Sequence, residues 1–257
     1  MTFDIKSEAE NTQVNIMVGG QAKRMNNEIK AMLEISGVPL IERTLRQYVG
    51  CGFRRFNILA GFGHEGIEDY LNNRSEYAKK AELRFSIDDA SWKAAGKGKA
   101  LKKALQDKVI DRSKRSIIVH PDDIFFDDKV PAKALEGHLE NDRGYWATVV
   151  TTSGTVYPYG EVLVEPSGRV DRFVAKSFVG KFTHTGLSVI EPAVYGEIEQ
   201  LVDLDSSSAQ EFEKVVLEKL ALEGKVANFT INPYGVWMSV NTLKDYETAK
   251  AMLEGKQ

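Results

Sequence analysis

The sequence predicts an α/β protein built on a doubly wound, mostly parallel sheet in three layers, with a β-rich second half. In the first half, short apolar runs that end in glycine or aspartate alternate with amphipathic segments, which is the pattern of βα units in a parallel sheet. After about residue 142, closely spaced strand and turn signals replace this pattern. We therefore expect one domain over residues 14–257, with halves at 14–142 and 143–257, behind a frayed polar tail over residues 1–13.

The first half alternates strands and helices. An apolar run from Val14 ends at a glycine pair, as a buried strand does before a tight turn. The first helix begins at Pro39, carries its apolar residues at helical spacing and ends at Gly50. Strands are expected over 14–18, 56–60, 83–87 and 116–120, and further helices around 67–71 and 100–105. Right-handed crossovers would place these helices on both faces of one sheet.

The second half is expected to contain more strands and to close with helices. A turn at Pro166-Ser167-Gly168 predicts a hairpin between two short strands. Strands are expected over 145–152, 161–165, 170–174, 182–190 and 226–231, and helices over 192–201, 210–222 and 242–253.

Composition narrows the class of protein. The chain has 257 residues, 42% of them hydrophobic, and a net charge of −3, which argues against a nucleic-acid partner. No apolar run is long enough to span a membrane, and the polar start does not resemble a secretory signal. The single cysteine, Cys51, cannot form an internal disulfide, which fits a cytoplasmic protein. Five lysines between Lys93 and Lys103 indicate either a solvated helix face or a positive wall beside a polyphosphate.

The turn after the first strand carries residues suited to phosphates. Gly19 and Gly20 let the backbone approach a ligand and direct amide N–H groups at it. Arg24 and Lys30 follow and supply a guanidinium fork and a point charge for a triphosphate. The segment is neither a P-loop nor a dinucleotide-binding fingerprint, and an ordinary tight βα connection is the alternative.

A second candidate lies at the end of the strand over 116–120. Asp122 and Asp123 follow that strand directly, and carboxylates at such a position are suitable ligands for Mg²⁺. A turn in which the aspartate side chains bond to the backbone is the alternative.

In order along the chain, these motifs resemble those of the sugar-1-phosphate nucleotidylyltransferases, the NDP-sugar pyrophosphorylases. The segment GGQAKRM, followed by Lys30 and then GVPLIER, resembles the family signature, with Ala22, Lys23 and Ile29 in place of the usual residues. The resemblance implies a Rossmann-like nucleotidyltransferase fold. It implies that Arg24 binds the β- and γ-phosphates, Lys30 the α-phosphate and Asp122 the Mg²⁺. It also implies a set of nucleotide-binding residues: Gly19, Gly20, Gln21, Gly96, Gly98 and Lys99.

The second half resembles the sugar-binding part of the same family. The resemblance implies a set of sugar-phosphate-binding residues: Tyr159, Gly160, Lys176, Thr185 and Gly186. Ala175 stands where the family has a glutamate. The closing segment GVWMSVNTLKDYE is similar to the glucose-1-phosphate cytidylyltransferase-like branch, but Ser239 or Asn241 occupies the position of the second metal-binding aspartate. Asn241 can still offer a neutral oxygen to Mg²⁺.

The expected activity is therefore Mg²⁺-dependent transfer from a nucleoside triphosphate to a sugar 1-phosphate, with glucose 1-phosphate favoured, releasing pyrophosphate. The acceptor phosphate is already anionic, so catalysis needs positioning and charge neutralisation rather than a general base. Two alternatives are a catalytically weak, nucleotide-sugar-binding regulatory subunit and a same-fold transferase for an alcohol phosphate or molybdopterin. A homodimer or higher homo-oligomer is the usual assembly for such a protein.

Overall fold

A mixed seven-stranded sheet forms the centre of the computed structural model, which describes residues 3–19, 21–22, 28–141, 143–157, 159–231 and 235–255. The strand order is β14-β10-β13-β8-β1-β6-β7. Their bounds are β1 Gln13–Met17, β6 Arg55–Ala60, β7 Glu82–Ile87, β8 Ser116–Val119, β10 Ala147–Val156, β13 Phe178–Ile190 and β14 Val226–Ile231. Neighbouring strands are parallel except at β13, which runs antiparallel to both β8 and β10. The mostly parallel sheet predicted from the sequence is confirmed.

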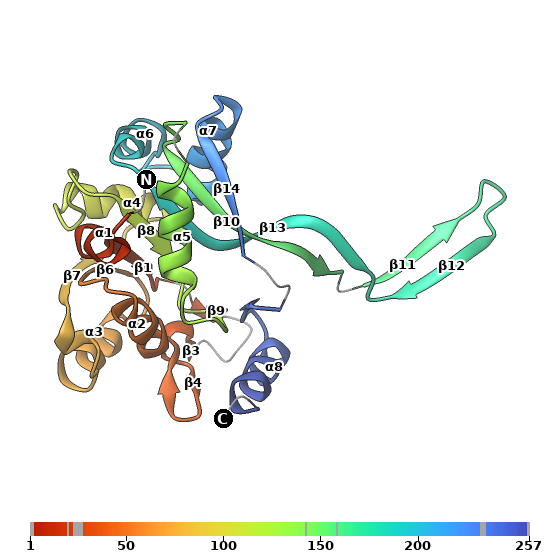
Figure 1. Cartoon of the computed structure of the whole chain (residues 1–257), viewed down its shortest axis with the longest axis horizontal. Coiled ribbons are helices and arrows are strands. Elements are labelled where there is room, and N and C mark those ends of the chain that lie inside the picture. Colours follow the sequence, from red (N-terminus) through yellow and green to blue (C-terminus); the bar gives the residue numbers. More distant parts are fainter. Residues whose placement is uncertain are drawn as a thin grey trace.

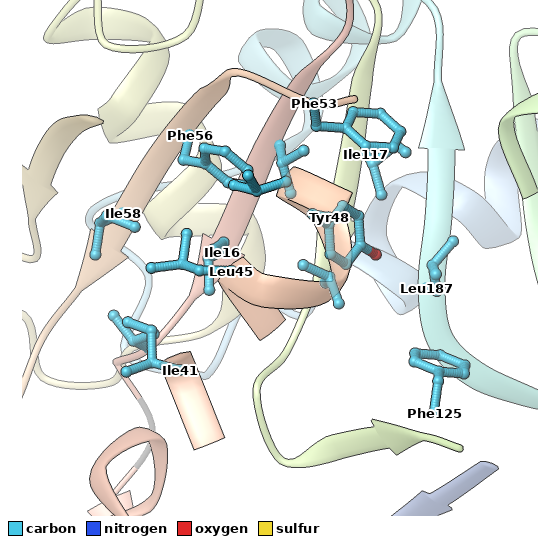
Figure 2. Packing of buried hydrophobic residues seen from close by; sticks show 14 of the residues in the cluster. Ile16, Ile41, Leu45, Tyr48, Phe53, Phe56, Ile58, Ile117, Phe125 and Leu187 are labelled. Carbon is cyan, nitrogen blue, oxygen red and sulfur yellow. The ribbon is translucent and has the colours of Figure 1, made fainter. Parts of the chain in front are cut away.

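Helices cover both faces of this sheet. One face packs against α1 Ile5–Asn11, α2 Leu40–Gly50, α3 His64–Asn73 and α5 Val130–Leu139. The other face packs against α4 Lys97–Gln106, α6 Ala193–Leu201, the π-helical segment η3 Glu213–Leu217 and α7 Glu218–Leu222. Successive strand residues point to opposite faces, so Ile16 and Ile58 join the first layer while Met17 joins the second. Figure 2 shows the first layer, in which Tyr48 and Phe53 pack beside Ile117.

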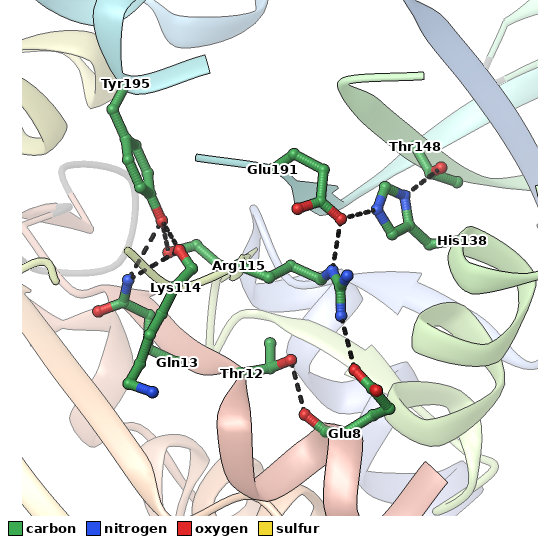
Figure 3. A network of polar contacts seen from close by, with 10 residues as sticks. Glu8, Thr12, Gln13, Lys114, Arg115, His138, Thr148, Glu191 and Tyr195 are labelled. Carbon is green, nitrogen blue, oxygen red and sulfur yellow. Dashed lines mark hydrogen bonds and ion pairs between the residues drawn. The ribbon is translucent and has the colours of Figure 1, made fainter. Parts of the chain in front are cut away.

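The first helix corrects the expectation of a frayed tail. Asp4 caps α1 by accepting hydrogen bonds from the backbone N–H groups of Lys6 and Ser7, and Ala9 is fully buried in the core. Glu8 also lies 3.1 Å from Arg115, whose guanidinium contacts Glu191 at 2.7 Å (Figure 3). The tail prediction was wrong for the described residues because one small apolar side chain and one ion pair hold this polar segment against the sheet.

The C-terminal segment returns to the first half of the chain. Strand β15 Trp237–Ser239 pairs antiparallel with β9 Asp123–Phe125. Helix α8 Leu243–Glu254 follows, with a capping box formed by Thr242 and Asp245. A third apolar cluster, which includes Leu33, Ile124 and Ala249, fixes this segment in place. Residues close to position 240 are thereby brought beside the end of β8.

Strands β10 and β13 extend beyond the sheet and lead into a hairpin. Its strands are β11 Gly160–Val164 and β12 Val170–Ala175, and they pair only with each other. Figure 1 shows this ribbon projecting from the body of the molecule. The hairpin predicted at Pro166-Ser167-Gly168 is therefore present, but it lies outside the core.

The remaining elements are short. They are β2 Gln21–Ala22, β3 Glu28–Ile29, the 3-10 helix η1 Lys30–Met32, β4 Glu34–Ile35, β5 Val38–Pro39 and the 3-10 helix η2 Ala78–Lys80. The sequence analysis missed these short elements, and it also missed α1, α5, β9 and β15. Within the described ranges, no helix combines the length and the apolar character needed to cross a membrane.

Candidate active site

A cavity of about 250 Å³ opens at the carboxyl ends of β1, β6, β7 and β8. We call it the inner cavity. Its polar and charged lining consists of Lys30, Asp88, Lys97, His120, Asp122 and Glu211. Gly19, which follows β1, and Gly96, which precedes α4, also line it. This is the position at which doubly wound sheets bind their ligands, and it contains Gly19, Lys30, Gly96 and Asp122 of the predicted set.

Two glycines bring strand ends close together on one wall of the inner cavity. A Cβ atom on Gly19 would lie 3.2 Å from Asp88 Oδ2, and one on Gly61 would lie 2.9 Å from the same oxygen. A side chain at Gly61 would therefore force the Asp88 carboxyl to move. Glycine is therefore needed here for close approach, and it leaves the Asp88 carboxyl facing the cavity.

Lys30 joins the two ends of the chain at the mouth of the cavity. Its Nζ atom donates a hydrogen bond of 2.8 Å to Asp122 Oδ2 and one of 2.9 Å to Asn241 Oδ1. Lys30 begins η1, Asp122 follows β8, and Asn241 lies between β15 and α8. Three residues that the sequence predicts for one site are thus brought together by tertiary structure.

Asp122 and Asn241 fit a hard divalent cation. Both oxygens already lie within 2.9 Å of one positively charged nitrogen, so the pair can face a single cation. Mg²⁺ takes one or two protein carboxylates and completes its coordination with phosphate and water. No cluster of three or more His, Cys, Asp or Glu side chains suited to a metal occurs among the described residues. Such a cation would therefore need ligands from a bound phosphate.

The charge of the inner cavity also favours a ligand that brings a cation. Its described lining has two ammonium groups, Lys30 and Lys97, and three carboxylic acids, Asp88, Asp122 and Glu211. Burial raises the pKa of Asp88 to about 6, and Lys103 only partly opposes this effect. Asp88 is therefore mostly ionised above pH 6. A bare polyphosphate would be repelled by these carboxylates, whereas a complex with a divalent cation would not.

The loop before α4 only partly matches its prediction. Gly96 lines the inner cavity, but the N–H of Gly98 donates a 2.7 Å hydrogen bond to the carbonyl oxygen of Gln210. The Lys99 side chain is fully buried, and its Nζ donates a 2.7 Å hydrogen bond to the carbonyl oxygen of Ser206. Both groups thus hold the loop that precedes η3, and nucleotide binding by Gly98 and Lys99 stays a prediction. Lys97 instead faces the cavity.

A wider cleft of about 490 Å³ adjoins the inner cavity and shares Lys97, His120 and Asp122 with it. We call it the outer cleft. Its other lining residues are Asp123, His184, Gly186, Glu213, Trp237, Ser239 and Asn241. Gly186 has a φ of +80°, and a Cβ atom there would overlap the Asp123 carboxylate. Glycine at this position therefore leaves room for the Asp123 carboxylate. Binding of the sugar phosphate by Gly186 stays a prediction.

The surroundings of two side chains in the outer cleft, His184 and Glu213, shift their pKa values. Burial lowers the pKa of His184, and its Nε2 lies 3.2 Å from the carbonyl oxygen of Leu187. The His184 side chain therefore favours its neutral form and contacts the backbone of its own strand, β13. Burial raises the pKa of Glu213, but the paired Lys97 ammonium outweighs this and lowers it below the ordinary value. His120 also lines this cleft, and neither of its ring nitrogens has a hydrogen-bond partner among the described residues.

The other residues predicted for the sugar phosphate lie elsewhere. Thr185 is fully buried and donates a hydrogen bond to the carbonyl oxygen of Val150, so its role is structural. Tyr159, Gly160 and Lys176 lie on the projecting ribbon and line neither cavity. Within one chain these residues lie away from both cavities, because the continued pairing of β10 with β13 carries the hairpin away from the sheet. Their binding of the sugar phosphate stays a prediction.

Some predicted residues lie outside the described part of the chain. Gly20 and Arg24 belong to this group. Gln21 is described only through its backbone, which pairs with Ile29.

The sequence analysis did not propose several of these lining residues as site residues, among them Asp88, Lys97, His120, Glu211 and Glu213. Asp88 and His120 each come directly after or at the end of a predicted strand, and this position is a usable signal. Lys97 was considered only as part of a lysine cluster. Glu213 carries no such signal, because η3 reaches the cleft from the far end of the sequence.

The fold and this site define a class of α/β protein with a charged cavity at the carboxyl edge of its central sheet. The family model described as Nucleotidyl transferase matches residues 14–256. The chain belongs to the Nucleotidyl transferase family.

Comparison with individual proteins agrees with this family. The bifunctional protein GlmU of Latilactobacillus sakei is 26% identical over 166 residues, which are 64% of this chain and 33% of that protein. The GlmU of Exiguobacterium sibiricum is 22% identical over 88% of this chain and 49% of that protein. The chain therefore spans a third to a half of the length of these relatives.

Solved structures show the same fold. A Bacillus anthracis crystal structure, assigned as a glucose-1-phosphate thymidylyltransferase, has a TM-score of 0.69 at 18% identity and covers 94% of both chains. HddC from Yersinia pseudotuberculosis has a TM-score of 0.68 at 20% identity, covering 94% of this chain and 99% of HddC.

Proposed function

We propose that this protein transfers a nucleotidyl group from a nucleoside triphosphate to a sugar 1-phosphate and releases pyrophosphate. The observation that carries the proposal is the convergence of Lys30, Asp122 and Asn241 within 2.9 Å at the mouth of the inner cavity. The family match and the two GlmU relatives support the general reaction.

The nucleotide is proposed to occupy the inner cavity and the acceptor the outer cleft. Asp122, Lys97 and His120 line both spaces, so the reacting phosphates would meet beside them. An oxygen of the sugar phosphate attacks the α-phosphorus, and the bond between that phosphorus and the bridging oxygen to the β-phosphate breaks. The pyrophosphate takes the bonding electrons. The nucleophile is already anionic, so no protein group has to remove a proton.

The residues are proposed to act through charge and position. Lys30 would leave Asp122 and stabilise charge on the α-phosphate, and Arg24 would bind the β- and γ-phosphates. Asp122 and Asn241 would hold Mg²⁺, which neutralises phosphate charge when it is bound. His120 lies at the junction of the cavities, where its buried ring nitrogens have no hydrogen-bond partner among the described residues and Nδ1 lies 3.5 Å from Asp123 Oδ2. We assign it a hydrogen bond to the acceptor. Glucose 1-phosphate is the proposed acceptor, from the resemblance of the closing segment.

The test measures nucleotide binding and pyrophosphate release with five nucleoside triphosphates, each paired with several sugar 1-phosphates and with an alcohol phosphate. Turnover with at least one pair is expected, and Lys30→Met should lower kcat by about 10²–10³-fold. Lys103→Met is the matched control, because Lys103 pairs with Asp107 on the surface of α4. Unchanged turnover in Lys30→Met would refute the assigned role. Nucleotide binding without release from any pair would favour the regulatory alternative, and release only with an alcohol phosphate would favour the other transferase.

A further inference from the structure

The Asp88 carboxyl lines the inner cavity and has no role in the proposed chemistry. The backbones of Gly19 and Gly61 pack against it on one wall of the cavity. Among the hydrogen bonds and ion pairs of the described residues, Asp88 makes only that of its backbone N–H to the Ala60 carbonyl oxygen, at 2.8 Å. Its side-chain oxygens are therefore available to a ligand in the cavity.

Asp88 lies on the β7 side of the cavity, away from the groups proposed to hold phosphate. Asp122 follows β8 and Asp88 follows β7, and β1 and β6 lie between these two strands in the sheet. At about 4.8 Å per strand, the axes of β8 and β7 are about 14 Å apart. A triphosphate held by Lys30 and Asp122 would therefore direct its base, rather than its phosphates, toward Asp88.

The same cavity offers apolar surface for the faces of a base. Met17 and Val18 lie at the end of β1, Leu59 lies near the end of β6, and Ala95 and Ala100 lie on either side of the first turn of α4. Binding pockets typically combine such apolar walls with a few polar groups that fix the orientation of the ligand. On the β7 side of this cavity, Asp88 supplies that polar group.

The charge of Asp88 restricts which base edge it can bind. Burial raises its pKa to about 6, so the carboxyl is mostly ionised at pH 7.5. An ionised carboxylate accepts hydrogen bonds through both oxygens and donates none. It therefore binds an edge with two adjacent donors, as it binds the fork of a guanidinium group, and it repels an edge that presents acceptors.

Only one of the common bases has such an edge. Guanine carries the N1–H and the 2-amino group side by side, so it can donate to both carboxylate oxygens. Adenine and cytosine each place one amino group beside an acceptor nitrogen. Uracil and thymine place one N–H between two acceptor oxygens. A carboxylate can thus make two good bonds with guanine and at most one with the others.

We propose that Asp88 selects a guanine nucleotide by accepting hydrogen bonds from its N1–H and its 2-amino group. The nucleotide donor is then GTP, and the product is a GDP-sugar. This inference rests on the proposed function in one respect, which is the placement of the triphosphate at Lys30 and Asp122. Asp88 determines specificity, because it touches the base and not the reacting phosphates.

Calorimetry of nucleotide binding tests the proposal, with Mg²⁺, at pH 7.5 and without an acceptor. The wild-type chain is expected to bind GTP about 100-fold more tightly than ATP, CTP or UTP, because each of these leaves the buried carboxylate poorly paired. ITP lacks only the 2-amino group of GTP. It should bind about tenfold more weakly than GTP, the value of one lost hydrogen bond to a charged group.

Asp88→Asn should reverse the preference among purines. Xanthine carries an oxygen in place of the 2-amino group, and an asparagine amide can donate to that oxygen while it accepts from N1–H. The variant should bind GTP about 100-fold more weakly than wild type and should prefer XTP to GTP. Asp89→Asn is the matched control, because Asp89 is the adjacent residue, is exposed and does not line the cavity. Its ranking of nucleotides should equal that of wild type.

Three results would overturn the guanine assignment: binding of ATP, CTP or UTP as tight as that of GTP, equal binding of ITP and GTP, and equal weakening of all five triphosphates by Asp88→Asn. The last result would assign Asp88 to the ribose hydroxyls, which every ribonucleotide carries. Binding of no triphosphate would overturn the proposed function as well. Guanine-selective binding without pyrophosphate release would overturn the proposed reaction and leave the base assignment intact.

Discussion

Asp88 makes the folded protein sensitive to pH. Burial raises its pKa from 3.8 to about 6, so the folded state binds a proton more tightly than the unfolded state does. The favourable contribution of protonated Asp88 is complete below about pH 4 and is lost as pH rises through 6. This shift corresponds to about 3 kcal/mol at most, and to about 2 kcal/mol once its partial solvent exposure is taken into account.

Asp88→Asn removes the ionisation and keeps the size of the side chain. We expect this variant to raise the free energy of unfolding by about 2 kcal/mol at pH 8 and to bring almost no gain at pH 4. The assay is urea unfolding at fixed temperature, followed by circular dichroism between pH 4 and 8. The difference between variant and wild type should grow through pH 5–7.

Asp89→Asn is the control for this experiment. Asp89 is the next residue, it is exposed, and its pKa is lowered by hydrogen bonds from Ser91. Asparagine there should give no gain at pH 8. A stability difference for Asp88→Asn that does not change with pH, or that grows toward acid, would refute the reasoning.

Three further substitutions test the site and the core. Asn241→Asp adds a carboxylate beside Asp122, and Mn²⁺ binding measured by calorimetry should tighten about tenfold because affinity follows ligand charge; an unchanged affinity would contradict the metal assignment. His120→Ala should raise the KM for the acceptor about tenfold, the value of one lost hydrogen bond, with little change in nucleotide affinity; an equal loss for both ligands would place His120 elsewhere. Glu42→Ala should lower the free energy of unfolding, measured with urea, by about 2–4 kcal/mol. The reason is that Glu42 accepts a 2.5 Å hydrogen bond from the Ser75 hydroxyl and a 2.9 Å one from the Glu76 N–H in the interior. A loss below about 1 kcal/mol would show that water replaces these bonds.

The sequence by itself determined the central sheet and several of the residues that line the inner cavity. Apolar residues recur every second position in a strand with one buried face and every three to four positions in a helix with one buried face. Burial against the sheet is therefore visible in the spacing of apolar residues along the sequence. The end of a parallel strand can also be recognised in the sequence, so Gly19 and Asp122 could be assigned to one edge of the sheet from the sequence alone. Helix α5 was missed because it has no side-chain cap at its start and only a weak apolar stripe.

Only the tertiary structure decided which distant residues meet. Asn241 reaches Lys30 across 211 positions because β15 pairs with β9, and no local pattern encodes that pairing. The same holds for Glu213, which enters the outer cleft from η3. Lys99 and Thr185 sit within motifs that predict binding, but burial and a backbone hydrogen bond give each a structural role. The sequence correctly predicted the hairpin of β11 and β12, but it did not predict that this hairpin projects away from the central sheet. Alternation within a ribbon indicates which residues share a face, whereas the direction in which the ribbon projects depends on the rest of the fold.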